Sequence, residues 1–575
     1  MRRRSAPRGL RQLKRMIARF ELRADAGRRT VVRCHSGAPP SKWCGHSTTR
    51  RPELPRATCT TPLARACHVV NTARSVGAVN TDGGIETRVP RAMSTQHPDN
   101  VATPIFSRDS LMSAEDEVRE AFYAFAHLGC DEQMWDFEGK EVDNFVVQKL
   151  LASNEQYFRA NPLGDRLRLT PRVPNPRFER VQAKGLLEVL HSLPRHADAA
   201  RLFFGASRPP IIELIFPMTT SALELERIRT YYLRNVVEAA KAPLVPGDIS
   251  VSTWCGAFEP ADIGVIPLIE DLPYLLEPEA IVADYVSGKD LPYQRVFIAR
   301  SDPALNYGLI AAVLASLVAL DKLDGLEQRL GIPILPIIGC GSAPFRGGLR
   351  PDSTARVLAT YPSVQTFTLQ SAFKYDYPAE RVRRAIETLR ATRRGPPMKV
   401  AKDPRLLALV SRAAERYRAE VREIAGLVNQ VAPHVPRRRL RKLHIGLFGY
   451  SREDQDMSLP RAITFCASLY SVGLPPELLG FAALDRGEWA YVKELVPGLA
   501  FHVEEGLAWL DPETESTLPP LVAESVRVAR ERCVAESNDE HLEVVRQIRA
   551  CLRDGQMYLL PELITRAGSA RRFLG

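Results

Sequence analysis

Short apolar runs rich in β-branched residues recur along the chain from about residue 165, and each ends in polar or glycine-rich residues. Several are almost continuously apolar, which is typical of parallel strands buried on both faces. The predicted strands are Leu167–Val173, Ile211–Pro217, Gly264–Glu270, Arg295–Arg300, Ile332–Ile338, Val364–Leu369 and Leu443–Phe448, with a weaker one near Ile249–Trp254.

Helical patterns lie between and after these runs. Gly308–Leu330 is apolar on one side and is followed by Gly331, a residue suited to ending a helix. Long amphipathic helices are also expected at 114–127, 404–430 and 519–553. Strands that alternate with helices in this number favour an α/β fold, a (β/α)8 TIM-type barrel with additional helices, over an open sheet. In such a barrel the chemistry gathers at the carboxyl ends of the strands.

The first residues break this pattern. Residues 1–80 show no sustained period, and they carry 18 Lys and Arg against 3 Asp and Glu. This tail resembles an organellar transit peptide. The alternative, which we favour, is that the tail is upstream sequence included because the start codon was assigned too early. Met93 is then a nearby start. We therefore expect a basic N-terminal extension over 1–87 and a barrel with added helices over 88–575.

Charge and apolar length exclude two classes of protein. The whole chain has a net charge of +11, and without the tail residues 81–575 carry −4. A nucleic-acid interface should form a basic patch on the folded part, so we expect no nucleic-acid partner. The longest apolar run, Gly308–Leu320, is too short to span a bilayer, so we expect no membrane association. Scattered cysteines without paired spacing suit a reduced, cytoplasmic enzyme, and a zinc site in the tail is a weak alternative.

Two predicted strands deliver carboxylates to the same rim. Glu270 ends one run, and Asp302 follows the next, just after Arg300. Two carboxylates with positions left for substrate and water suit Mg²⁺ or Mn²⁺. The alternative is that each carboxylate merely caps a helix, since Asp favours that position.

A glycine-rich stretch follows the next strand, Gly339 to Arg350. Its backbone can approach an anion closely, and Arg346 and Arg350 add planar donors suited to phosphate or carboxylate. A solvated surface loop is the alternative. His97 lies in the polar segment Ser94 to Asn100, where a histidine can act as a general base near neutral pH, or can be structural. Chemistry alone leaves aldol lyases, phosphotransferases and carboxylases open.

A chain of sequence blocks is more specific. MSTQHPDNVATP, HLGCDEQMWDFEGKEVDNFVV, LTPRVPNP, FPMTTSALEL, VIPLIED, ARSDPALNYG, GCGSAPFRGGLRPD, SVQTFTLQSAFKYDYP and KLHIGLFGYSR occur in this order. They resemble archaeal-type phosphoenolpyruvate carboxylases from about residue 88 to about 480, and more loosely to the last glycine. Phe137 and Cys340 depart from the expected blocks, but neither removes a charged group.

The resemblance implies a lyase that carboxylates phosphoenolpyruvate with bicarbonate to oxaloacetate and phosphate, through carboxyphosphate and an enolate held by Mg²⁺ or Mn²⁺. It implies a homotetramer. It also implies roles at matching positions. His97 and Arg346 would be catalytic, Glu270 and Asp302 would hold the metal, and Arg172 would contact phosphate. Arg300, Arg350 and Lys374 are further candidates for binding the anionic substrate.

Two rival functions remain open from the sequence. Another barrel enzyme acting on phosphoenolpyruvate or pyruvate would explain the metal and the arginines, but not His97 together with the FRGG loop. A nucleic-acid-binding protein would act through the basic tail. Bicarbonate dependence and removal of the tail separate these alternatives from the carboxylase.

Overall fold

The computed structural model describes residues 85–138, 143–206, 208–440, 452–454 and 457–575 of the chain. Eight strands close into a barrel in chain order, every neighbouring pair is parallel, and β1 pairs with β8. The strands are β1 Ala92–Ser94, β2 Glu132–Asp136, β3 Arg168–Arg172, β4 Glu213–Phe216, β5 Gly264–Ile269, β6 Gln294–Ala299, β7 Ile334–Gly339 and β8 Thr366–Leu369. The predicted (β/α)8 barrel is confirmed.

One strand prediction is wrong, and two strands were not predicted. Six predicted runs are barrel strands, but Ile249–Trp254 is wrong: its residues belong mainly to helix α7 Val251–Cys255, whose first turn is capped by the Ser250 side chain. The first two strands, β1 and β2, were missed because β1 has three residues and β2 reads Glu-Gln-Met-Trp-Asp. The predicted strand Leu443–Phe448 lies outside the described residues.

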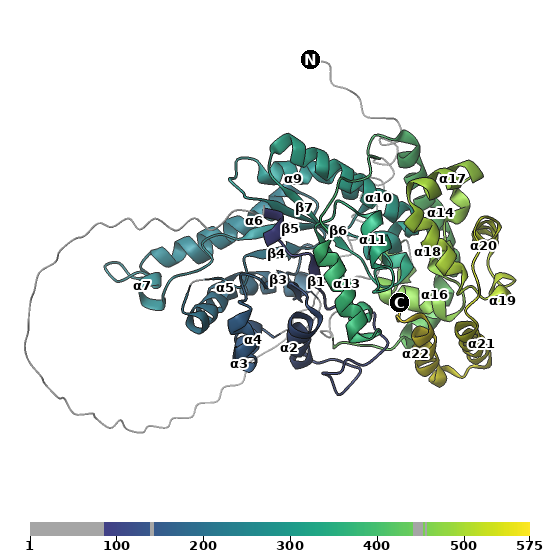
Figure 1. The fold of residues 1–575 in the computed structure, drawn as a ribbon, viewed down its shortest axis with the longest axis horizontal. Coiled ribbons are helices and arrows are strands. Elements are labelled where there is room, and N and C mark those ends of the chain that lie inside the picture. The colour runs from purple at the N-terminus through teal and green to yellow at the C-terminus, as the bar shows by residue number, and fades with distance from the viewer. Residues whose placement is uncertain (1–84, 139–142, 207, 441–451, 455–456) are drawn as a thin grey trace, which may run out of the picture.

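Helices cover the barrel and extend it on one side (Figure 1). They are α2 Ala114–Tyr123, α3 Val146–Ser153, α4 Glu155–Ala160, α5 Ala183–Phe204, α6 Ala222–Tyr232, α7 Val251–Cys255, α8 Leu272–Leu275, α9 Pro278–Val286, α10 Ser301–Leu330, α11 Thr354–Thr360, α12 Ser371–Tyr375, α13 Ala379–Ala391, α14 Pro404–Val431, α16 Ala462–Ser471, α17 Arg486–Leu495, α18 Pro497–Leu507, α19 Pro512–Glu515, α20 Pro520–Arg532, α21 Asp539–Asp554 and α22 Leu560–Arg571. β9 Arg452–Asp454 pairs antiparallel with β10 Met457–Leu459. The helices predicted at 114–127 and 404–430 are confirmed. The one predicted at 519–553 is two helices, because the chain leaves α20 at Cys533 and Asn538 caps α21.

Helix α10 forms the seam between the barrel and the C-terminal helices. It follows β6 directly, packs along α14, and ends at Gly331 in the left-handed conformation, as predicted. Gly308, with φ of 83°, interrupts it where a Cβ would lie 2.8 Å from the Tyr417 ring. Of the described helices, α10 is by itself long and apolar enough to cross a membrane, and 94% of its most apolar stretch is buried inside the protein. This burial is that of a core helix.

The barrel interior is layered. At the amino end, Arg295 pairs with Glu132 at 2.7 Å and Glu213 at 3.3 Å, and it donates to Thr366. Removing one partner of such a buried pair costs about 3–5 kcal/mol, because the other charge is left uncompensated. Above it lies an apolar layer that includes Met134, Ile266, Leu268, Phe297 and Ile337. The next polar side chains inside the barrel lie above this apolar layer, at the carboxyl ends of the strands.

The C-terminal helices α16–α22 gather on one side of the barrel, away from α5 and α7 (Figure 1). The chain end then returns to the barrel: the Leu574 amide donates to the Asp99 carbonyl at 2.7 Å. Gly575 is enclosed so tightly that a Cβ would lie 2.2 Å from the Ile463 carbonyl oxygen. The last residue of the chain thus lies beside the loop that follows β1.

Candidate active site

Strand alternation decides which rim residues face the lumen. Along β5, Ile266 and Leu268 belong to the cluster inside the barrel, so Glu270 also points inward. Arg172 ends β3 in the same way, two residues after Thr170, whose hydroxyl bonds the lumen residue Glu132. The structure therefore brings Arg172 and Glu270 together, and they interact electrostatically.

Arg172 is held by two carboxylates from the segment after β2. Its Nε and Nη2 donate to the two carboxylate oxygens of Asp136 at 2.8 and 2.9 Å. A carboxylate oxygen of Glu138 also lies 3.1 Å from Nε. This forked arrangement fixes the guanidinium plane and raises the Arg172 pKa well above its ordinary value despite burial. Arg172 is therefore a permanent, oriented positive charge at the rim.

The charge of Glu270 is only partly compensated by its surroundings. Burial raises its pKa well above the ordinary value, and the negative charges of Asp302 and Glu138 raise it further. Arg172 and the Met218 amide, which donates to Glu270 at 2.6 Å, only partly oppose this. Met218 has a φ of 52°, a strained conformation for a non-glycine residue. A carboxylate in this surrounding is stabilised by a cation.

The donor set fits a hard divalent cation. Within the described part of the chain, no three His, Cys, Asp or Glu side chains form a group that could hold a metal ion by themselves. Mg²⁺ does not need three, because it keeps several waters and binds through one or two carboxylates plus substrate oxygens. Glu270 and Asp302 supply two oxygen donors that lie close enough to interact. The residues present thus fit Mg²⁺ or Mn²⁺ better than zinc.

Arg346 reaches the same rim from the loop after β7. Its guanidinium is 1% exposed, and it donates to Ser301 Oγ, Asp99 Oδ2, the Gly575 carbonyl and Gln370 Oε1. The loop turns at Gly347 and Gly348, with φ of 120° and 65°, values that favour glycine. Arg346 is therefore positioned beside Ser301, the residue before Asp302, rather than in solvent.

His97 lies in the segment between β1 and Asp99. Its Nδ1 is 3.0 Å from the Thr95 hydroxyl, and its carbonyl accepts from the Ser371 amide at 3.1 Å. The preceding Gln96 accepts from the Asp136 amide at 2.9 Å. His97 is partly buried. Through Gln96 and Asp136 it shares a bonded framework with Arg172.

Three predicted substrate ligands lie off the lumen. The Lys374 ammonium donates to Ser94 Oγ, the Thr95 carbonyl and Glu120, so its three protons already bond protein acceptors. Burial lowers its pKa. Arg300 falls on the outward side of β6, since Phe297 and Ala299 face inward. Arg350 points toward α18 and pairs with Glu505 at 2.5 Å. This geometry does not favour direct substrate contacts for Lys374, Arg300 or Arg350.

A family model described as phosphoenolpyruvate carboxylase matches residues 89–575. The chain belongs to the phosphoenolpyruvate carboxylase family. It is 47% identical over 489 residues to the phosphoenolpyruvate carboxylase of Methanothermobacter thermautotrophicus, covering 85% of this chain and 100% of that one. The corresponding values are 46% over 488 residues for Methanospirillum hungatei, with 85% and 100% covered, and 49% over 427 residues for Pyrococcus furiosus, with 74% and 89% covered. The predicted family is confirmed.

A solved malate synthase complex from Haloferax volcanii is similar only in part. It aligns at 11% identity with a TM-score of 0.32, over 52% of this chain and 69% of that chain. This likeness is too slight to inform the active site of the phosphoenolpyruvate carboxylase family member described here.

Several residues of this carboxylase-family rim escaped prediction. Asp136, Glu138 and Gln370 lie in polar stretches that sequence alone could not assign to the lumen or to solvent. Asp99 lies inside the QHPDN block, yet nothing marked its side chain as the link to the glycine-rich loop. Gly575 gave no signal, because its place depends on the return of the whole C-terminal region. Lys140, Glu141 and the block around Leu443–Tyr450 lie outside the described residues.

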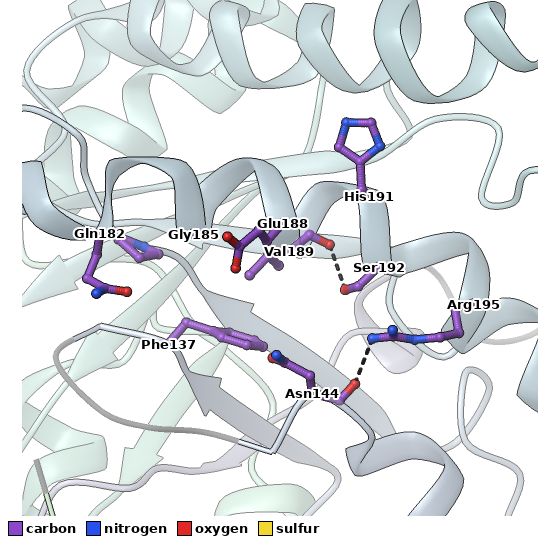
Figure 2. A pocket seen from close by; sticks show the side chains of 10 residues that line it. Phe137, Asn144, Gln182, Gly185, Glu188, Val189, His191, Ser192 and Arg195 are labelled. Carbon is purple, nitrogen blue, oxygen red and sulfur yellow. Dashed lines mark hydrogen bonds between the residues drawn. The ribbon is translucent and has the colours of Figure 1, made fainter. Parts of the chain in front are cut away.

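A cavity of 510 Å³ lies just outside the rim, between α5 and the loops after β2 and β3. Figure 2 shows Phe137 and Asn144 facing the α5 side chains, with Arg195 donating to the Asn144 carbonyl at 3.0 Å. In the sequence, Phe137 lies between Asp136 and Glu138, the two carboxylates beside Arg172. By strand alternation it points away from them, so this cavity adjoins the family's rim without belonging to the lumen.

Proposed function

We propose that this protein carboxylates phosphoenolpyruvate with bicarbonate and releases oxaloacetate and phosphate. The observation that carries the proposal is the family match over 89–575, in which Glu270, Asp302, Arg172 and Arg346 fall on one rim. The buried, only partly compensated carboxylate of Glu270, the neighbouring carboxylate of Asp302 and two buried arginines suit a cation and a phosphorylated carboxylic acid together.

The proposed roles follow from where each group lies. Glu270 and Asp302 hold Mg²⁺ or Mn²⁺, which when bound supplies Lewis-acid stabilisation of negative charge on oxygen. Arg172, oriented by Asp136 and Glu138, contacts the substrate phosphate or carboxylate. Arg346 neutralises the phosphoryl group during its transfer. His97 assists the proton and charge changes on the bicarbonate-derived group.

The reaction balances in two stages. A bicarbonate oxygen attacks the substrate phosphorus, and the bond from phosphorus to the enol oxygen breaks, which gives carboxyphosphate and the enolate of pyruvate. Carboxyphosphate then releases CO2 and phosphate, and the enolate carbon forms the new bond to CO2. The second stage requires that water stays out, because water would protonate the enolate. The buried loop residues Phe345 and Arg346 suit this requirement.

Three finer features belong to the same proposal. Lys374, together with Glu120, is assigned to positioning the end of β1 rather than to binding substrate. We further propose a homotetramer and a cytoplasmic location, following the family resemblance. The six cysteines among the described residues are all unpaired, which supports a reducing compartment. Analytical ultracentrifugation of the full chain tests the tetramer.

Isotope transfer tests the proposed chemistry directly. Bicarbonate labelled with ¹⁸O at all three oxygens should place one label in the released phosphate and two in the new carboxylate. Arg346→Gln should lower the rate by orders of magnitude, whereas Arg381→Gln, a surface arginine paired with Asp352, should not. Phosphate released without label during oxaloacetate formation would contradict attack by bicarbonate on phosphorus.

A further inference from the structure

Thr95 is a buried polar residue at the rim of the barrel, beside His97. It directly follows β1 and is 0% exposed. Two residues before it, Met93 belongs to the apolar cluster inside the barrel, so the Thr95 side chain also points into the lumen. Its hydroxyl oxygen lies 3.0 Å from Nδ1 of His97 and 3.4 Å from the carbonyl oxygen of Leu369. Thr95 therefore holds the His97 ring at the lumen side of the rim.

The two contacts of this hydroxyl indicate which nitrogen of His97 carries the proton. A threonine hydroxyl has one proton to donate, and a backbone carbonyl can only accept. Both contacts are attractive only if the hydroxyl donates to the Leu369 carbonyl and Nδ1–H of His97 donates to the hydroxyl oxygen. If the hydroxyl donated to Nδ1 instead, lone pairs of two oxygens would face each other across 3.4 Å. The contacts thus favour a neutral His97 with its proton on Nδ1.

Thr95 is itself fixed by its backbone. Its amide donates to the Leu369 carbonyl at 3.0 Å, and its carbonyl accepts from the Lys374 ammonium at 2.9 Å. The branched threonine side chain has few χ1 rotamers. The backbone of His97 is held as well, because its carbonyl accepts from the Ser371 amide at 3.1 Å. The hydroxyl and the imidazole are thus held in one relative orientation.

We propose that Thr95 is a positioning residue that fixes His97 in the Nδ1–H tautomer, so that Nε2 exchanges a proton with the reacting groups. The inference rests on the proposed carboxylation. In that reaction the hydroxyl proton of bicarbonate moves to Nε2 as a bicarbonate oxygen attacks phosphorus. The imidazolium, whose Nδ1–H still donates to Thr95, then returns this proton to the phosphate that leaves carboxyphosphate together with CO2. His97 ends neutral, and the phosphate leaves as hydrogenphosphate.

Thr95→Val removes the hydroxyl and keeps the shape of the side chain. We expect kcat to fall by about 10- to 100-fold, because hydrogen bonds to a charged group such as the imidazolium are the stronger ones. KM for phosphoenolpyruvate should change by less than about twofold, since Thr95 acts through His97 and not on bound substrate. Thr95→Ser, which keeps the hydroxyl, should restore most of kcat.

Thr514→Val is the matched control. Thr514 is buried on α19, among the C-terminal helices, and its hydroxyl donates to the Val472 carbonyl at 2.9 Å (Figure 1). The control therefore also loses a buried bond from a hydroxyl to a carbonyl, but it leaves the rim intact. Thr514→Val should lower the unfolding temperature and keep kcat, so a loss of kcat in Thr95→Val is not explained by lower stability alone.

The tautomer is measured independently of activity by solid-state ¹⁵N NMR of the full chain labelled at its histidine rings. The His97 signals are those that disappear in His97→Gln. In the neutral ring we expect a protonated Nδ1 and an unprotonated Nε2. In Thr95→Val the proton should move toward Nε2, because Nδ1–H has lost its acceptor.

Several results would overturn the proposal. One is a neutral His97 with its proton on Nε2 in the unmodified protein, and another is an unchanged kcat in Thr95→Val. A third is a Thr95→Ser variant as slow as Thr95→Val. If Thr95→Val does not fold, the tautomer in the unmodified protein and kcat of Thr95→Ser decide. If the unmodified protein forms no oxaloacetate, the proposed function fails; a proton on Nδ1 would then still support the orientation of His97 by Thr95, and a proton on Nε2 would overturn it.

Discussion

Asp99 joins four parts of the active site, and its replacement by asparagine is the most informative single perturbation. Oδ1 accepts from the Ala372 amide at 2.7 Å, and Oδ2 accepts from the Ser342 amide at 3.1 Å while lying 3.4 Å from Arg346 Nη1. Its carbonyl accepts from Leu574. The side chain is 0% exposed. Asp99 thus ties the segment after β1 to the loop after β7, to α12 and to the chain end.

Asparagine keeps the volume but offers only one accepting oxygen. Whichever way the amide is turned, its NH2 group faces a backbone donor, and Arg346 loses its counter-charge. Leaving one buried N–H without an acceptor costs about 1–3 kcal/mol, and hydrogen bonds to a charged group are worth about 1.5–3 kcal/mol. We therefore expect Asp99→Asn to destabilise the loop conformation that places Arg346 at the rim by about 2–5 kcal/mol. Since 1.4 kcal/mol corresponds to a factor of ten, kcat should fall by about 30-fold or more.

The assay is steady-state oxaloacetate formation, with kcat and KM for phosphoenolpyruvate and for bicarbonate measured separately. Asp109→Asn is the matched control, because Asp109 also accepts a backbone amide, from Leu111 at 3.1 Å, but is exposed. A role in positioning Arg346 predicts a loss mainly in kcat for Asp99→Asn. Unchanged kcat in a variant with unchanged stability would refute the reasoning.

Three further substitutions test neighbouring parts of the account. Arg346→Ala should abolish oxaloacetate formation, with at most slow phosphate release; near-normal carboxylation would remove Arg346 from the mechanism. Burial raises the pKa of Glu477, which accepts from the Phe345 amide, to about 7 from 4.5, so its contribution to stability is complete below about pH 4.5 and is lost as the pH rises through about 7. Between pH 5 and 8 the free energy of unfolding of the unmodified protein should fall by up to about 3 kcal/mol through this group, and chemical denaturation should show that Glu477→Gln does not share this fall. The same dependence on pH in both proteins would argue against a role for Glu477. Gly575→Ala should lower kcat and thermal stability, because the added Cβ would lie 2.2 Å from the Ile463 carbonyl oxygen and 2.6 Å from the Ala467 amide nitrogen; a variant with normal kcat would show that the tight enclosure of Gly575 is not needed.

The periodic apolar runs were enough to predict the barrel, because β3 to β8 are buried on both faces and stand out from their surroundings. β2 was missed for the opposite reason. Glu132 and Asp136 point into the lumen, one into the ion network at the amino end and the other toward Arg172 at the rim. A strand that carries the polar layers of a barrel does not look apolar, so β2 left no apolar run in the sequence.

Strand alternation separates the site predictions that agree with the geometry from those that do not. Glu270 and Arg172 continue the inward face of their strands. Arg300 lies one residue beyond the inward Ala299, so it falls on the other face even though it stands at a strand end. Lys374 could not be judged this way, because its partners Ser94 and Glu120 are 280 and 254 residues away in the chain. Long-range polar networks of this kind are specified by tertiary packing and have no local signal.

Bicarbonate-dependent oxaloacetate formation by the full chain tests the central claim most directly. The reaction contains phosphoenolpyruvate and Mg²⁺, and oxaloacetate is followed through its reduction by malate dehydrogenase. Our account predicts product only when bicarbonate, phosphoenolpyruvate and the divalent metal are all present, and loss of product when the metal is chelated. A folded protein that forms no oxaloacetate under these conditions, or forms it equally without bicarbonate, would contradict the assignment.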